Sequence, residues 1–158
     1  MPASARRTNR GESAFTLPEL LIALAIISVL AMIALPRYAD YRERVRVHEA
    51  TVDIRAFSAL ISNYHLDARA FPPSLGVINR AGKLDPWGRP YVYTNLQAMK
   101  GKGAARKNKN LVPINSDYDL YSVGRDGASS GPLTATNSQD DVIRANDGGY
   151  IGLASKYE

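Results

Sequence analysis

An acidic side chain, Glu19, lies inside an otherwise apolar run near the start of this 158-residue chain. The run extends from Phe15 to Leu35, and its other departures from apolar character are a threonine, a proline and a serine. Burying an ionised carboxylate in hydrocarbon costs on the order of 3 kcal/mol even on lenient insertion scales. Glu19 is therefore expected to have a specific partner.

Residue types that perform catalytic or redox chemistry are scarce elsewhere in the sequence. The chain contains no cysteine, which excludes disulfides, thiolate metal sites and a cysteine nucleophile. His48 and His65 have no obvious carboxylate or nucleophile companions. No glycine-rich phosphate loop, zinc-binding helix motif or nucleophile elbow occurs. These features argue against an enzyme.

The apolar run has the length of a membrane-spanning helix. As a helix, residues 15–35 would be roughly 30 Å long, which is enough to cross a bilayer. Arg6, Arg7 and Arg10 precede the run and are expected to keep its N-terminal side in the cytoplasm. An ordinary secretory signal is the alternative, but it would have a shorter apolar core followed by a small-residue cleavage site, and no clear site follows here.

Residues 14–20, Ala-Phe-Thr-Leu-Pro-Glu-Leu, resemble the processing site of type IV pilins and type II secretion pseudopilins. The resemblance implies that a prepilin peptidase cuts between Ala14 and Phe15 and methylates Phe15, and that Glu19 acts in assembly. Ala14 departs from the family's usual glycine, and Pro18 replaces a more usual apolar residue. Pro18 would lie in the first turn of the mature helix, where a missing N–H costs little.

The chain is expected to fold as an α+β protein of the type IV pilin kind, with a long helix packed on a small antiparallel sheet. A cleaved leader (1–14) precedes a transmembrane or filament-core helix (15–36), which Pro36 could kink. An amphipathic helix follows over residues 37–66. Its apolar stripe recurs at helical spacing and consists of Val47, Ala50, Ile54, Phe57, Ile61 and Tyr64.

Residues 67–158 are expected to form the globular sheet and loop region. Strands are predicted over residues 91–94 and 118–123, where aromatic and β-branched residues gather. A weaker candidate lies over residues 111–114, where Pro113 suggests an edge strand. Two or three such strands would cover the helix stripe.

Three blocks in this region resemble the major pseudopilin of type II secretion. They are residues 85–93 (Asp-Pro-Trp-Gly-Arg-Pro-Tyr-Val-Tyr), residues 118–127, which end in Gly-Arg-Asp-Gly, and residues 140–143 (Asp-Asp-Val-Ile). Two features depart from that family: a basic stretch over residues 100–109 and a long gap between Gly127 and Asp140. The cations of the stretch are Lys100, Lys102, Arg106, Lys107 and Lys109, which we interpret as a solvated loop rather than a nucleic-acid site.

The resemblance also implies a structural calcium site. The major pseudopilin binds calcium through three carboxylates that match Asp126, Asp140 and Asp141, and the family's backbone ligand suggests Val123. Ser138 is a weaker candidate. Calcium needs six to eight oxygen ligands, so carbonyls or water would complete the set. Such an ion would order the loop over residues 128–139 and stabilise a domain without disulfides. The alternative is a simple turn at Asp126 and a solvated pair at 140–141.

The implied function is that of a non-enzymatic subunit of a pseudopilus, a homopolymer filament in type II protein secretion across the outer membrane. Before assembly the subunit would cross the inner membrane once, in contact with lipid, with its N-terminus in the cytoplasm and its C-terminal domain in the periplasm. Its partners would be prepilin peptidase, the inner-membrane assembly platform and minor pseudopilins. The alternatives are an extracellular type IV pilus or minor pilin for adhesion or DNA uptake, and a membrane-tethered binding module that does not polymerise.

Overall fold

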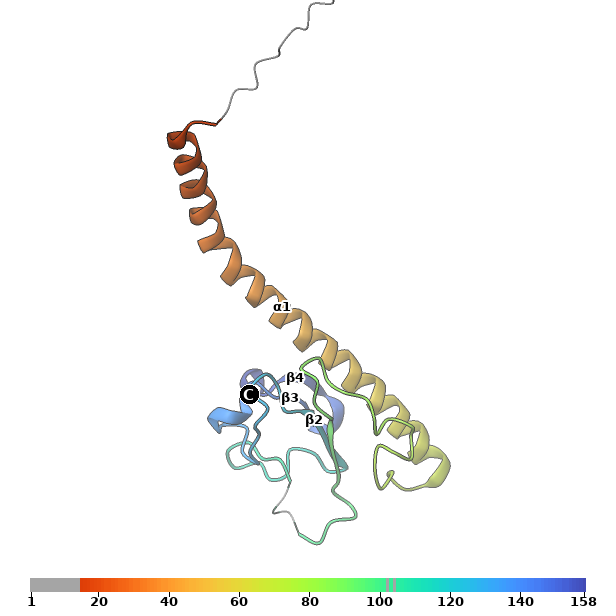
Figure 1. Ribbon diagram of the computed structural model, residues 1–158. Helices are drawn as coiled ribbons and strands as arrows, with labels where there is room; N and C mark the ends of the chain where they lie inside the picture. The colour runs from red at the N-terminus through yellow and green to blue at the C-terminus, as the bar shows by residue number, and fades with distance from the viewer. Residues whose placement is uncertain (1–14, 102, 104) are drawn as a thin grey trace, which may run out of the picture. The chain divides into compact units, whose positions relative to one another are not determined.

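The computed structural model describes residues 15–101, 103 and 105–158. A long helix, α1 (Leu17–Ala68), comes first and the strands follow it in the chain (Figure 1). Two compact units meet in sequence between Tyr41 and Arg42. The predicted leader, residues 1–14, lies outside the described residues.

The first unit contains the apolar part of α1, and its large side chains are exposed. Ile27, for example, is 60% exposed. Pro36 lies inside α1 and does not end it. The Ser28 hydroxyl donates a hydrogen bond to the carbonyl oxygen of Leu24 at 2.7 Å, so this polar group is satisfied within the helix. By length and composition, α1 contains a segment able to cross a membrane.

The second unit, Arg42–Glu158, contains a four-stranded antiparallel sheet. Its strands lie in chain order: β1 (Val92–Asn95), β2 (Tyr118–Ser122), β3 (Val142–Ala145) and β4 (Tyr150–Leu153). Tyr121 of β2 pairs with Val92 on one side and with Ile143 on the other. Short 3₁₀ turns lie in the C-terminal loops: η1 (Thr136–Ser138), η2 (Asn146–Gly148) and η3 (Ala154–Lys156).

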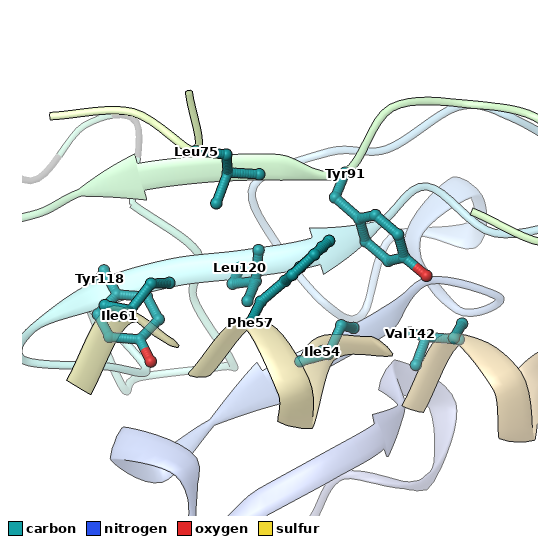
Figure 2. Close-up of a cluster of buried hydrophobic side chains, with 9 residues drawn as sticks. Ile54, Phe57, Ile61, Leu75, Tyr91, Tyr118, Leu120 and Val142 are labelled. Atoms are coloured by element: carbon teal, nitrogen blue, oxygen red, sulfur yellow. The ribbon is translucent and has the colours of Figure 1, made fainter. Parts of the chain in front are cut away.

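The part of α1 in this unit packs on the sheet through the predicted stripe. Ala50, Ile54, Phe57 and Ile61 are buried in one cluster with residues of the first three strands, such as Leu120 and Val142. In Figure 2 the side chains of Ile54, Phe57 and Ile61 point from the helix toward side chains of the strands, among them Tyr118, Leu120 and Val142. The Phe57 and Tyr91 rings meet edge to face with centroids 4.9 Å apart. The expected α+β architecture of one long helix and an antiparallel sheet is confirmed.

Loops cover the other face of the sheet. Val142 belongs to the helix-side cluster, whereas its neighbour Ile143 belongs to a second cluster with Ile114, Leu133 and Ala154. Adjacent residues of a strand point to opposite faces, so β3 is buried on both sides. The second cluster matters for the candidate site, because the loops that form it carry the predicted calcium ligands.

The predicted strand over residues 111–114 is wrong. Asn108 and Leu111 instead exchange backbone hydrogen bonds of 3.0 and 2.8 Å in a tight turn, and the Ile114 N–H donates to the carbonyl of Arg106. The prediction also missed β3 and β4. Their connection, η2, contains Asn146, Asp147 and Gly148 with φ values of 53, 52 and 95°. Asn, Asp and Gly are the residues that tolerate this left-handed conformation, so the sequence does contain a turn signal.

Candidate functional site

The residues predicted to act in processing and assembly lie at the start of α1. Phe15 is 87% exposed, and Ala14 lies outside the described residues. Glu19 Oε2 accepts hydrogen bonds from the Thr16 backbone N–H at 2.9 Å and from the Thr16 hydroxyl at 2.7 Å. Thr16 precedes the first helical residue and Glu19 is the third, which is the spacing of a capping box. Within one subunit, the Glu19 carboxylate therefore caps its own helix.

Asp126 and Asp140, two of the three predicted calcium ligands, lie together at the surface. The Asp126 backbone N–H donates to Asp140 Oδ2 at 2.8 Å. Both residues line a surface cavity of about 420 Å³, together with Glu43 and Arg125. The turn at residues 124–127 lies close to Asp140, and it can do so because residue 124 is a glycine. A Cβ on Gly124 would lie only 2.3 Å from the Asp140 carbonyl oxygen. The structure thus brings these two carboxylates together.

Asp141, the third predicted ligand, is completely buried and bound to other groups. Its Oδ2 lies 2.6 Å from Arg106 Nη2 and accepts a hydrogen bond from the Ser129 hydroxyl at 2.6 Å. Burial raises the pKa of Asp141 to about 6, while the Ser129 hydrogen bond and the Arg106 charge act in the opposite direction. Asp141 is therefore the counter-ion of an arginine.

Arg106 is buried, with 4% of its side chain exposed. Its guanidinium carbon lies 4.3 Å from the centre of the Tyr121 ring, and its backbone N–H donates to Asp119 Oδ2 at 2.8 Å. The interpretation of residues 100–109 as a solvated loop is wrong at Arg106, although Lys107 is exposed. No local pattern marks Arg106, because its counter-ion lies 35 positions further along the chain.

A second pair that sequence reasoning missed joins Arg144 to Asp117. The guanidinium donates to both carboxylate oxygens, at 2.8 and 2.7 Å. It also lies over the Tyr118 ring, with its carbon 4.0 Å from the ring centre. Such a two-point contact fixes both groups, so it ties β3 to the loop before β2.

The described side chains do not fit the expected calcium site. No group of three or more His, Cys, Asp or Glu residues among them is placed to hold a metal ion. Arg89 Nη1 donates to the Gly124 carbonyl at 2.7 Å and to the Arg125 carbonyl at 3.3 Å, so the turn carbonyls beside Asp126 already have a cationic donor. Val123 is half-buried. The Ser138 hydroxyl is bonded to the backbone of Ser130.

Comparison with known proteins gives matches at both the N-terminus and across the chain. The prokaryotic N-terminal methylation motif matches residues 9–35. The chain is 30% identical to type II secretion system core protein G of Pseudomonas aeruginosa, over 78% of this chain and 90% of that protein. It is 38% identical to a fimbrial protein of Neisseria meningitidis, over 88% of this chain and 82% of that protein. The type IV major pilin protein PilE of Neisseria gonorrhoeae is 27% identical over 91% of this chain and 89% of its own length. No solved structure matches at a significant level.

Proposed function

Since the chain belongs to the type IV pilin and pseudopilin superfamily, we propose that it is a non-enzymatic subunit of a pilus-like filament that acts in type II protein secretion. The observation that carries the filament part is the first unit, where the large apolar side chains of a membrane-length helix are exposed. A helix that is apolar on all sides needs lipid or other protein around it. Copies of the same helix supply that environment in a filament.

We favour secretion over a surface pilus because residues 85–93, which contain the turn before β1, resemble the major pseudopilin of type II secretion. Asp85 is 4% exposed and its carboxylate accepts hydrogen bonds from the backbone N–H groups of Trp87 and Arg89 and from the Ser122 hydroxyl. The block that resembles the major pseudopilin is therefore an ordered turn that is joined to β2. A surface pilus subunit is the second candidate, favoured by the higher identity to the meningococcal fimbrial protein.

Processing would convert the membrane form into the assembly form. Prepilin peptidase would cut between Ala14 and Phe15 on the cytoplasmic face and methylate Phe15, while the C-terminal domain lies in the periplasm. The new Phe15 amine carries a positive charge. In the low-dielectric core of a filament, Glu19 of one copy could neutralise the amine of the next, because an unpaired buried charge is costly. The membrane platform and minor pseudopilins would assist this step.

Two variants of Glu19 separate helix capping from charge pairing. Glu19→Gln can still accept hydrogen bonds from Thr16, as a capping box requires, but it carries no charge. Glu19→Ala loses both properties. If charge pairing drives assembly, both variants should insert and be cleaved normally, as intact mass would show, and both should lose filaments to a similar extent. Filament yield at the wild-type level from Glu19→Gln would contradict the pairing.

Deletion of the gene for this protein in the source cell separates the two candidate roles, secretion and a surface pilus. If the subunit acts in secretion, folded exoproteins should accumulate in the periplasm while surface pili remain. Loss of surface pili with normal protein release would favour the pilus subunit. A mature protein that begins at Met1 or Pro2 would instead support a membrane-tethered module that does not polymerise.

A further inference from the structure

The two segments that depart from the major pseudopilin pattern lie side by side in the structure. Arg106 belongs to the basic stretch between β1 and β2, and Ser129 belongs to the long segment between β2 and β3. Lys107 connects them through its backbone: its N–H donates to the Gly131 carbonyl at 3.0 Å, and its carbonyl accepts from the Leu133 N–H at 2.8 Å. The two departures therefore form a single structural feature.

Arg106 places a cation at the point where these segments meet the sheet. Its guanidinium contacts Asp141 just before β3, Ser129 in the long segment and the Tyr121 ring of β2. The Ser129 hydroxyl also donates to Asp141, so the three side chains form a closed set. Because the Arg106 and Asp141 side chains are only 4% and 0% exposed, the Asp141 charge depends on Arg106 for compensation.

We propose that the Arg106 guanidinium is the internal cation that orders the C-terminal loops, and that this domain is stable without bound calcium. Asp141 Oδ2 is already used by Arg106 and Ser129. A divalent ion at the same carboxylate would lie beside a positive guanidinium, and like charges repel strongly where water is excluded. At Asp126 and Asp140, Arg89 already occupies the neighbouring Gly124 and Arg125 carbonyls, so few protein oxygens remain there for calcium, which needs six to eight ligands.

The rival arrangement is calcium bound at Oδ1, the second carboxylate oxygen of Asp141. Asp141 Oδ1 and Arg106 Nε have no hydrogen-bond partner among the described residues. An ion at Asp141 Oδ1 would share the carboxylate with the guanidinium at Oδ2, and the two like charges would repel each other, so calcium and Arg106 compete for this carboxylate. The experiment must therefore vary both cations.

Thermal melting of the full-length processed chain in detergent micelles tests the proposal. The wild-type chain is melted with calcium chloride and with a calcium chelator. Equal midpoints are expected, and calorimetric titration with calcium should give no binding heat. A melting midpoint that falls clearly in chelator would overturn the proposal. This test does not depend on whether the protein forms a secretion pseudopilus or a surface pilus.

Variants of Arg106 give the second readout. Arg106→Gln leaves Asp141 buried without a counter-ion, and the midpoint should fall by roughly 10 °C. Arg106→Lys retains the charge and should recover part of that loss. Lys107→Gln is the matched control, because Lys107 is the exposed neighbour and its side-chain charge is removed in the same way. A midpoint of Arg106→Gln equal to that of Lys107→Gln would overturn the proposal. If Arg106→Gln does not fold, Arg106→Lys and the wild-type comparison still decide the question.

Discussion

The two parts of α1 are built from similar apolar side chains but have opposite surroundings. Ile27 in the first unit is 60% exposed, whereas Ile54 in the second is 0% exposed. Around Ile54 the helix has one apolar stripe and an otherwise polar surface, which is the pattern of a helix that packs on its own domain. Around Ile27 it has no polar face. The difference teaches that one continuous helix can serve two environments. The pattern of polar residues indicates which part packs on its own domain and which part does not.

Replacing Ile54 by alanine is expected to have the largest effect on folding. The substitution leaves a cavity between α1 and the sheet, and such losses cost about 4 kcal/mol when the site cannot collapse. Urea unfolding of the full chain in micelles measures the loss. Val52→Ala on the same helix is the control, because Val52 is 51% exposed. Equal stability of the two variants would mean that the helix does not pack on the sheet through this stripe.

The turn at Gly124 should be the next most sensitive position in the second unit. Gly124 has φ of +65°, and an added Cβ would lie 2.3 Å from the Asp140 carbonyl oxygen. Gly124→Ala therefore combines backbone strain with a clash against the backbone, and we expect a loss of about 3 kcal/mol in the same unfolding experiment. Gly82→Ala is the control, since nothing lies within 4 Å of its Cβ position. A loss no greater than that of Gly82→Ala would argue against this close approach of turn and loop.

The helix and two of the strands could be predicted because their signals are local. The stripe that contains Ile54 and Phe57 repeats with the period of a helix, and burial follows that period. The strand at 118–123 is marked by its aromatic and β-branched residues and ends close to the observed β2. The β3–β4 hairpin also has a local signal, its Asn-Asp-Gly turn, which the prediction did not use.

The buried charges could not be predicted, because they depend on contacts between distant segments. Arg106 lies in a basic stretch that is typical of a solvated loop, and nothing near it in sequence indicates burial. The separation of Asp141 from Asp140 has a similar origin. Asp140 is half-buried beside the turn, whereas Asp141 is completely buried under the loops. A resemblance to a calcium-binding pattern identifies carboxylates, but it does not show where each side chain points.

A smaller effect is expected from removing the hydrogen bond between Tyr91, the residue just before β1, and α1. The Tyr91 hydroxyl donates to Asp53 Oδ2 at 2.9 Å. Tyr91→Phe removes that bond but keeps the ring against Phe57, so the loss should be about 1 kcal/mol. Tyr41→Phe, at a residue that is 60% exposed in the first unit, makes the same chemical change as a control. No difference between the two variants in urea unfolding would mean that the Tyr91–Asp53 bond adds nothing to stability.

Ile27→Ala should have the smallest effect on the isolated subunit, although it makes the same chemical change as Ile54→Ala. No described part of the chain buries Ile27, so the substitution opens no internal cavity, and the unfolding free energy of the second unit should change by less than about 0.5 kcal/mol. If copies of the helix surround Ile27 in a filament, the yield of filaments should fall even though the subunit is as stable as wild type. A loss of subunit stability as large as that of Ile54→Ala would show that the first unit is already packed within one chain, and the contrast between the two parts of α1 would then fail.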